Sequence, residues 1–276
     1  MANETPQFFL NRDHKRLFAV FHESNRALRQ SFAVVFCAAL FEDKLWSHRV
    51  LVNFARRLAA RGIAVLRFDY FGDGESEGDF RDASVSSRVA DIGDAVDLCR
   101  RQSEADRVYV LGLCYGGTLA LRAALRAETA DGVVAWQPIM DGGRYASELL
   151  RAHLSAQMVQ HRRIVNDREA LVRQIMANQP VNVEGYEIGK GLYTEMIAVD
   201  VLEMLREPRK AVLVQQISLA ERVEPQYAEL AKVTAKPLEF SCVREVKFWT
   251  SQKKVFPPCD QLFAGTMEWL VKTART

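Results

Sequence analysis

Residues 107–125, RVYVLGLCYGGTLALRAAL, constrain the fold more than any other part of the chain. The segment begins with an apolar run typical of a buried strand and ends with Ala, Leu and Arg in a pattern typical of a helix. Between the two, Gly112 and Gly116 flank Cys114. Because glycine tolerates backbone conformations and close contacts that other residues do not, the segment predicts a buried strand that turns sharply into a helix. We expect the side chain of Cys114 to be exposed at that turn.

Apolar runs alternate with amphipathic stretches along the rest of the chain. Strands are expected at residues 17–21, 31–40, 63–70, 108–111, 132–139, 210–218 and 243–249, and helices at residues 47–62, 84–102, 117–127 and 262–274. Strands separated by helices of this length form right-handed βαβ units. The chain is therefore predicted to be an α/β protein with a mostly parallel, twisted sheet and helices on both faces.

The stretch from about residue 143 to residue 208 interrupts this alternation. Its pattern is mostly helical, and it contains a break rich in Gly, Pro and Asn, NQPVNVEGYEIGKG. We interpret residues 1–142 and 209–276 as the α/β core and residues 143–208 as an inserted helical lid over the carboxyl ends of the strands. The apolar side chains expected on the inner face of the lid are Leu154, Met158, Ile164, Leu171 and Ile175. Packing between the helices explains these side chains equally well.

Composition limits the environment and the partners of the chain. Its 276 residues carry a formal net charge of +2, which gives no electrostatic reason to expect a nucleic-acid partner. No segment approaches the roughly 18 uninterrupted apolar residues of a membrane span, and the N-terminus lacks the pattern of a secretory signal. The 5 cysteines are widely spaced, which argues against a disulfide framework or a CxxC metal site and suits a reducing cytoplasm. We therefore expect a cytoplasmic protein without a membrane span, metal or cofactor; the sequence leaves its oligomeric state open.

The sequence GLCYGG around Cys114 resembles the nucleophile elbow of the α/β-hydrolase superfamily, with cysteine in the usual serine position, as in the dienelactone-hydrolase branch. Residues 68–80, FDYFGDGESEGDF, resemble the loop after the preceding strand in esterase-like and serine-aminopeptidase-like members. Residues 135–150 and 246–270 are similar to bacterial hydrolase-like proteins associated with exosortase and exopolysaccharide systems. The resemblance runs from about residue 17 to the C-terminus without the insertion. It implies the α/β-hydrolase fold and acyl chemistry on an ester or a thioester.

The resemblance makes Cys114 the candidate nucleophile. The N-terminus of the following helix offers partial positive charge and free N–H groups, which favour a thiolate and stabilise an oxyanion. In this fold a second oxyanion donor comes from an earlier loop, where most members carry His-Gly and this chain has Ala38 and Ala39. The expected donors to an oxyanion are the backbone N–H groups of Leu40 and Tyr115.

No histidine stands where the triad of this superfamily requires one. The triad runs nucleophile, acid, histidine in chain order, and the loop before the last helix, TSQKKVFPPCDQ, contains no histidine. His48, near the start of a predicted helix, and His153, in the insertion, are the candidate replacements for the base. The acid is also irregular. Its candidates are Asp141, just before the insertion, and Glu221, in a loop that also offers Glu224.

Three hypotheses follow from this missing histidine. In the first, a relocated base serves Cys114. In the second, Cys114 acts without a triad, because a thiol with a pKa of about 8.5 loses its proton more readily than an alcohol. In the third, the fold has become a non-catalytic binding or assembly protein of a biosynthetic or exopolysaccharide pathway. A lyase or isomerase that uses Asp or Glu in the same pocket is a further alternative. Our prediction is an enzyme that transfers or hydrolyses the acyl group of a small-molecule or carrier-bound substrate through an acyl intermediate on Cys114. The non-catalytic protein is the alternative.

Overall fold

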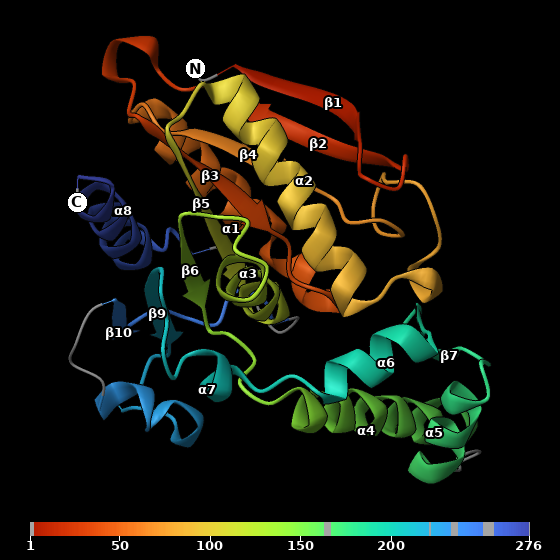
Figure 1. Ribbon diagram of the computed structural model, residues 1–276. Helices are drawn as coiled ribbons and strands as arrows, with labels where there is room; N and C mark the ends of the chain where they lie inside the picture. Colours follow the sequence, from red (N-terminus) through yellow and green to blue (C-terminus); the bar gives the residue numbers. More distant parts are fainter. Residues whose placement is uncertain (1–2, 163–166, 221, 233–236, 251–256, 276) are drawn as a thin grey trace.

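One large twisted sheet organises the molecule (Figure 1). The computed structural model describes residues 3–162, 167–220, 222–232, 237–250 and 257–275, with side chains for all of these except residues 156–161. Within them, eight strands lie in the order β1-β2-β4-β3-β5-β6-β9-β10. These strands are β1 (Glu4–Leu10), β2 (Arg16–His22), β3 (Phe32–Cys37), β4 (Ala64–Phe68), β5 (Arg107–Leu113), β6 (Gly132–Trp136), β9 (Ala211–Ile217) and β10 (Leu238–Val243). β2 is antiparallel to both β1 and β4, and the other neighbouring strands are parallel.

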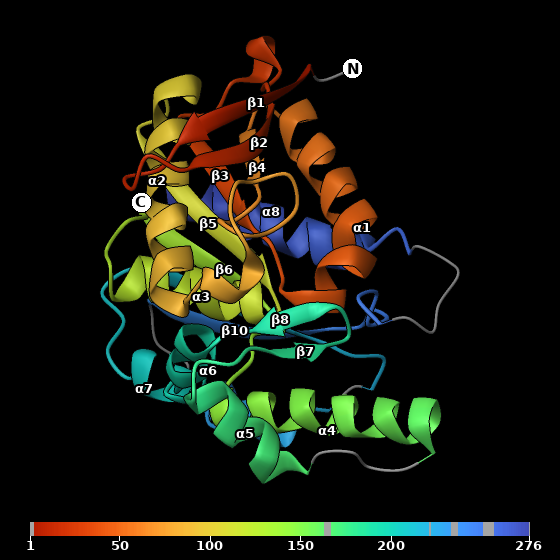
Figure 2. The same cartoon turned by 90° about the vertical axis from the view of Figure 1, so that its right-hand side faces the viewer.

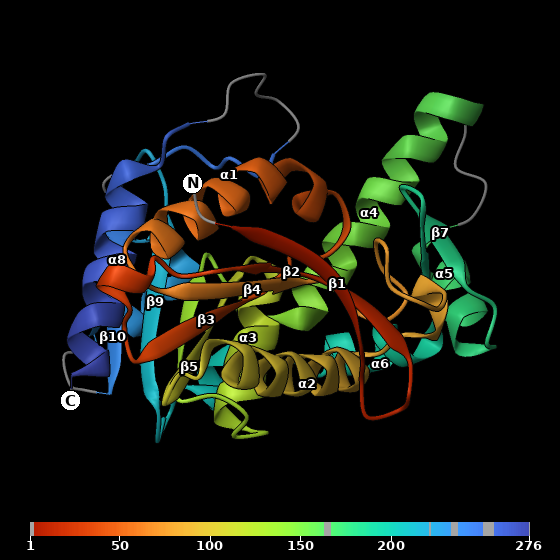
Figure 3. The same cartoon turned by 90° about the horizontal axis from the view of Figure 1, so that it is seen from above.

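Helices cover both faces of this sheet. They are α1 (Phe41–Ala60), α2 (Val85–Ser103), α3 (Tyr115–Leu125) and α8 (Asp260–Ala274). Seen from above, α1 and α8 lie on one face and α2 and α3 on the other (Figure 3). Val34 and Val35 are consecutive in β3, so they point to opposite faces; Val34 is buried in the cluster of Val50 from α1, and Val35 in that of Ile92 from α2. The strands are therefore apolar on both sides, as expected of a parallel sheet between two helical layers.

The chain between β6 and β9 forms a further layer at the carboxyl ends of the parallel strands (Figures 1 and 2). It consists of α4 (Gly142–His161), α5 (Arg168–Met176), a hairpin of β7 (Val181–Val183) and β8 (Tyr186–Ile188), α6 (Lys190–Ile197) and α7 (Val201–Met204). Of the apolar side chains expected on its inner face, Leu171 and Ile175 are fully buried and Leu154 is half-buried. The side chain of Met158 and the whole of Ile164 lie outside the described residues. Packing of the segment accounts for Leu171 and Ile175. None of the helices in the described ranges is long and apolar enough to cross a membrane.

The first helix begins earlier than the sequence predicts. We expected its N-terminus at Ser47, but α1 begins at Phe41 and Ser47 lies one and a half turns inside it. There the hydroxyl group of Ser47 donates a hydrogen bond to the backbone oxygen of Asp43 at 2.6 Å. The helix therefore starts directly after the Ala38-Ala39 loop, and Asp43 belongs to its first turn.

The last predicted strand, at residues 243–249, is wrong. β10 ends at Val243, after pairing in parallel with β9 along its whole length. The apolar residues Phe248 and Trp249 of this segment are buried in a turn, with their ring centroids 5.2 Å apart. As a result, Lys247 lies on the connection between β10 and α8 and not in the sheet.

Candidate active site

Cys114 lies at the sharp turn between β5 and α3, as the sequence predicts. Its φ of 49° and ψ of −124° are rare for a residue other than glycine. The turn is tight, since a Cβ atom on Gly116 would lie 2.4 Å from the carbonyl oxygen of Ala38, and one on Gly112 would lie 2.1 Å from that of Gly116. The backbone N–H of Cys114 donates to the carbonyl oxygen of Trp136 at 2.9 Å. The expectation of an exposed side chain is wrong, however, because Cys114 is only 2% exposed.

The carboxyl group of Asp43 is the side chain that acts most strongly on the thiol of Cys114. Asp43 lies in the first turn of α1, where the positive end of the helix dipole favours a carboxylate. Burial nevertheless raises the pKa of Asp43 to about 6, the negative charge of Glu42 adds to the rise, and the interaction with the thiol opposes it. Near neutral pH, the carboxyl group of Asp43 beside the thiol is therefore mostly ionised.

The same contact keeps Cys114 protonated. Burial raises the pKa of the Cys114 thiol well above its ordinary value, and the neighbouring carboxylate of Asp43 raises it further. The positive charge of Lys247 acts in the opposite direction but is the smallest of these effects. The helix N-terminus was expected to favour a thiolate at this position; in the resting site, desolvation and Asp43 outweigh it.

Aromatic side chains cover the site from the inserted segment and from the β9–β10 connection. Tyr145, at the start of α4, stacks on Tyr115 with ring centroids 5.4 Å apart and lies 6.4 Å from the ring of Phe41. Burial raises the pKa of Tyr145, as do the charges of Asp43 and Cys114. On the other side, the hydroxyl group of Tyr227 donates to the carbonyl oxygen of Pro138 at 2.8 Å.

A lysine and a glutamate lie on the two connections that normally carry the histidine and the acid. Lys247 follows the last strand, and its Nζ contacts Oε1 of Glu224 at 3.0 Å. Glu224 follows the penultimate strand, and its Oε2 accepts hydrogen bonds from Nε2 of Gln137 at 3.1 Å and of Gln226 at 3.0 Å. The carboxylate of Glu224 is thus fixed by the amide groups of Gln137 and Gln226, and it pairs with Lys247. Lys247 is near enough to Cys114 to act on the pKa of its thiol.

The two predicted oxyanion donors have no competing acceptor. Within the described residues, no hydrogen bond uses the backbone N–H of Leu40 or that of Tyr115. Leu40 is the N-cap of α1, and Tyr115 is the first residue of α3. Both N–H groups are therefore unused donors at helix N-termini. One follows the Ala38-Ala39 loop, and the other follows Cys114 in the elbow.

The structure does not bring the predicted histidines to Cys114. His48 is on α1 but lines a different cavity, where burial and the charge of Arg67 lower its pKa while Asp69 raises it. His153 is half-buried in the second half of α4. Neither is among the groups that act on the pKa of Cys114. Asp43 and Lys247 take the places beside the thiol that sequence reasoning gave to a histidine.

The predicted acids have other positions. Asp141 is the N-cap of α4, and its Oδ1 accepts a hydrogen bond from the backbone N–H of Arg144 at 2.9 Å. Glu221 lies outside the described residues. Glu224, which the same loop also offered, is the described carboxylate paired with Lys247. Within the described part of the chain, no three His, Cys, Asp or Glu side chains come together to hold a metal ion.

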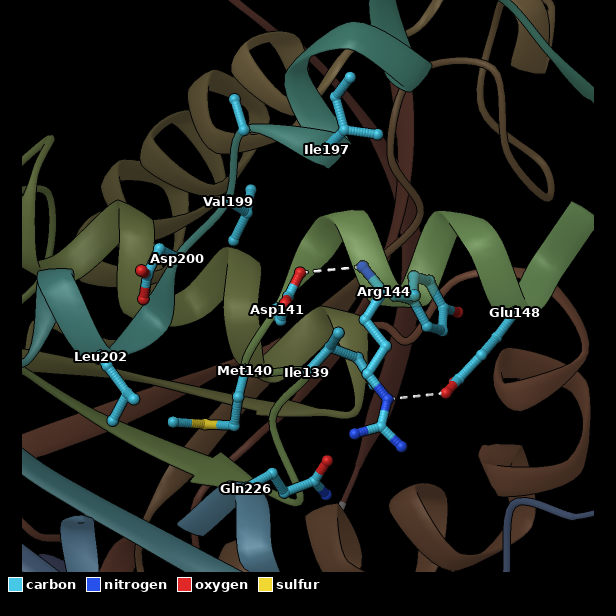
Figure 4. A pocket seen from close by; sticks show the side chains of 12 residues that line it. Ile139, Met140, Asp141, Arg144, Glu148, Ile197, Val199, Asp200, Leu202 and Gln226 are labelled. Carbon is cyan, nitrogen blue, oxygen red and sulfur yellow. Dashed lines mark hydrogen bonds and ion pairs between the residues drawn. The ribbon is translucent and has the colours of Figure 1, made fainter. Parts of the chain in front are cut away.

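A cavity of about 470 Å³ adjoins the site beneath α4 (Figure 4). Its lining combines apolar side chains such as Ile197 and Val199 with the paired Arg144 and Glu148, whose Nε and Oε1 are 2.9 Å apart. Tyr145 lines the cavity and stacks on the ring of Tyr115, the residue that follows Cys114. The cavity therefore lies close to the elbow.

The chain matches the family model of serine aminopeptidase, S33, over residues 40–215, which is more than half of its length. The matched region begins at the first predicted oxyanion donor and ends in β9. A search of the curated proteins found no match.

Solved structures share the fold at low sequence identity. Est1E from Butyrivibrio proteoclasticus, with bound ferulic acid, is similar with a TM-score of 0.70 and 15% identity, over 98% of this chain and 100% of that one. An esterase from Pyrococcus furiosus has a TM-score of 0.66 and 15% identity, over 99% of this chain and 92% of that one. The α/β hydrolase GrgF from Penicillium has a TM-score of 0.66 and 16% identity, over 99% and 100%. These likenesses confirm the predicted α/β-hydrolase fold.

Proposed function

Since the chain belongs to the serine aminopeptidase family of α/β hydrolases, we propose that it is an enzyme that takes an acyl group from an ester or thioester onto Cys114 and passes it to water, an amine or a thiol. The observation that carries this proposal is the proximity of Asp43 to the Cys114 thiol, since each of these two groups shifts the pKa of the other. It answers the question raised by the missing histidine, since it gives the thiol proton an acceptor inside the elbow.

In the first step, Sγ of Cys114 attacks the acyl carbonyl while its proton moves to the carboxylate of Asp43. The carbonyl π electrons move to oxygen, and the N–H groups of Leu40 and Tyr115 stabilise the oxyanion. When the tetrahedral intermediate collapses, the bond to the leaving group breaks and the leaving alkoxide or thiolate takes the proton back from Asp43. The products are an acyl-Cys114 thioester and a neutral alcohol or thiol.

The pKa values require proton transfer to accompany attack. The raised pKa of the thiol leaves almost no resting thiolate, whereas the pKa of Asp43, about 6, makes this carboxylate a better base than an ordinary one. Lys247 assists because its positive charge, held by Glu224, favours negative charge on sulfur. In the second step, the same carboxylate takes the proton of the acceptor that attacks the thioester, the bond from the acyl carbon to Sγ breaks, and the proton passes from Asp43 to the leaving thiolate of Cys114.

We also propose that residues 143–208 act as a lid over this site. Tyr145, from the first turn of α4, lines the adjoining cavity and stacks on Tyr115, the residue next to Cys114. Movement of α4 would therefore open the thiol to that cavity, whose apolar walls suit an acyl chain.

A non-catalytic binding protein is the second candidate, and one observation favours it. A thiol that is buried and protonated is the ordinary state of a structural cysteine. In that case the elbow would be retained for its packing alone, and Asp43 would be only a polar neighbour of the thiol.

Intact-mass spectrometry after incubation with acetyl, butanoyl and octanoyl thioesters of N-acetylcysteamine separates the two candidates. The wild type and Cys242→Ala, a control that removes an exposed thiol, are expected to gain one acyl group, and Cys114→Ala none. Acylation that is absent from the wild type, or that disappears only in Cys242→Ala, would refute the proposed acyl intermediate and favour the binding protein.

A further inference from the structure

A second cavity, of about 270 Å³, lies on the face of the sheet that α1 covers. Val20 in β2, Arg67 in β4 and Phe36 in β3 line its floor. These residues occupy matched positions on neighbouring strands, since Val20 pairs with Arg67 and Arg67 with Phe36 in the sheet register. The side chain of Arg67 therefore lies between two apolar neighbours.

One face of α1 forms the opposite wall. Lys44, His48 and Leu51 are spaced by four and three residues, which places them on one side of a helix, and all three line the cavity. Nζ of Lys44 lies 2.7 Å from Oδ1 of Asp69 and 3.0 Å from Oδ1 of Asp73. Its charge is therefore already compensated. None of the side chains that act on the pKa of Cys114 lines this cavity.

The charge of Arg67 is not compensated in this way. Its Nε donates to Nε2 of the buried His22 at 2.9 Å, but no carboxylate of the described residues lies within ion-pair distance of its guanidinium group. Burial lowers the pKa of Arg67, and only the more distant Glu4 and Asp69 oppose this. A largely buried cation without a negatively charged counter-ion is costly, and an anion in the cavity would offset that cost.

We propose that this cavity binds a small carboxylic acid with an apolar body. The carboxylate pairs with the guanidinium group of Arg67, whose planar donors match its geometry, and His48 at the rim supplies a second donor. The body of the ligand packs against Val20, Phe36 and Leu51. Because the volume lies just below the range of about 300–1,000 Å³ that small-molecule sites occupy, the ligand is a single ring or a short branched chain. The proposal does not depend on acyl chemistry at Cys114, although Ala38 and Ala39, which precede the proposed oxyanion donor Leu40, also line the cavity.

Isothermal titration of the purified full chain with benzoate, benzamide and acetate tests the charge and the apolar body separately. Benzoate is expected to bind one to one, with benzamide and acetate each weaker by about tenfold or more. Arg67→Met is expected to weaken benzoate by a similar factor. Arg101→Met, which removes an exposed arginine of α2, leaves benzoate binding unchanged.

Two further variants make the test decisive. Val20→Phe keeps the guanidinium group but fills the cavity, so it must also abolish benzoate binding, even if Arg67→Met folds poorly. Lys247→Met probes binding at the Cys114 site instead. Benzamide binding as tight as that of benzoate, full binding by either cavity variant, loss of binding in Lys247→Met alone, or no binding of benzoate to the wild type would each overturn the proposal.

Discussion

The carboxylate of Asp43 and the thiol of Cys114 act on each other at the buried elbow, although Asp43 comes from the first turn of α1 and Cys114 from the turn that precedes α3. Each group shifts the pKa of the other, because the carboxylate raises the pKa of the thiol and the thiol lowers that of the carboxylate. Replacing either residue therefore changes the other in a direction that can be measured.

Asp43→Asn should separate the reactivity of the thiol from its catalytic use. Loss of the negative charge lowers the pKa of Cys114, so alkylation by iodoacetamide near pH 8 becomes faster. Acylation by a thioester becomes slower, by about 100-fold or more, because the base is lost. Mass spectrometry of both reactions measures the two rates. In Glu42→Gln, which removes the neighbouring carboxylate, both rates stay close to those of the wild type. If Asp43→Asn slowed alkylation and acylation alike, Asp43 would be only a packing residue.

The pH dependence of acylation should follow Asp43. With a pKa of about 6, the rate rises with pH through that value and levels off above about pH 7, once the carboxylate is ionised. A rate that instead rises steeply above pH 8 would indicate that the thiolate, formed without a base, is the reacting species. Single-turnover acylation measured from about pH 5 to pH 9 distinguishes the two profiles.

The same carboxyl group should reduce stability at neutral pH. Its pKa in the folded protein, about 6, lies above its ordinary value of 3.8. The unfolded chain therefore loses this proton first, and the contribution of the group to the free energy of unfolding falls as the pH rises from about 4 to 6, by up to roughly 3 kcal/mol. Asp43→Asn is expected to unfold at higher urea concentration than the wild type at pH 7, with a smaller difference near pH 4. A destabilised variant at pH 7 would show that the ionised form is favoured by contacts that outweigh its burial.

Lys247→Met should act on the thiol in the opposite sense to Asp43→Asn. Without the ammonium charge, the pKa of Cys114 rises further, so alkylation and acylation both become slower, with acylation falling about tenfold. Lys272→Met is the matched control, because Lys272 is an exposed lysine of α8 whose Nζ lies 3.8 Å from Oε1 of Glu239. Equal rates in Lys247→Met and the wild type would exclude an electrostatic role for Lys247.

Adjacent glycines at the elbow should differ in their tolerance of a methyl group. A Cβ on Gly116 would lie 2.4 Å from a backbone oxygen of Ala38, whereas the nearest atom to a Cβ on Gly117 is a backbone oxygen at 3.0 Å. We expect Gly116→Ala to lower the free energy of unfolding by about 3 kcal/mol and Gly117→Ala to lower it by about 1 kcal/mol or less. Urea denaturation measures both values. An equal loss in the two variants would mean that the Ala38 loop adjusts to the added atom.

The fold could be predicted because its evidence is local. Each buried strand is an apolar run, each covering helix is amphipathic, and the glycines around Cys114 mark the turn. The N-terminal strand β1 escaped prediction because it lies at the edge of the sheet and its burial alternates only weakly. The finer resemblance to exosortase-associated proteins stays a prediction.

The site could be predicted only in part, because its chemistry depends on tertiary contacts. Cys114, Leu40 and Tyr115 follow from the turn and its neighbouring loop. Asp43 could not be identified as the base from residues 42–44, EDK. Only the observed start of α1 at Phe41 decides which of these three side chains lies beside Cys114. Lys247 was missed because its segment was predicted to be a strand, whereas its aromatic residues Phe248 and Trp249 are buried in a turn.

The burial of Cys114 also bears on how the protein withstands oxidants. Hydrogen peroxide oxidises thiolates, and the first product, a sulfenic acid, forms at sites that are both ionised and accessible. A side chain that is 2% exposed and kept protonated by Asp43 meets neither condition, whereas Cys242 is exposed. Cysteine at this elbow is therefore shielded from peroxide in the resting protein.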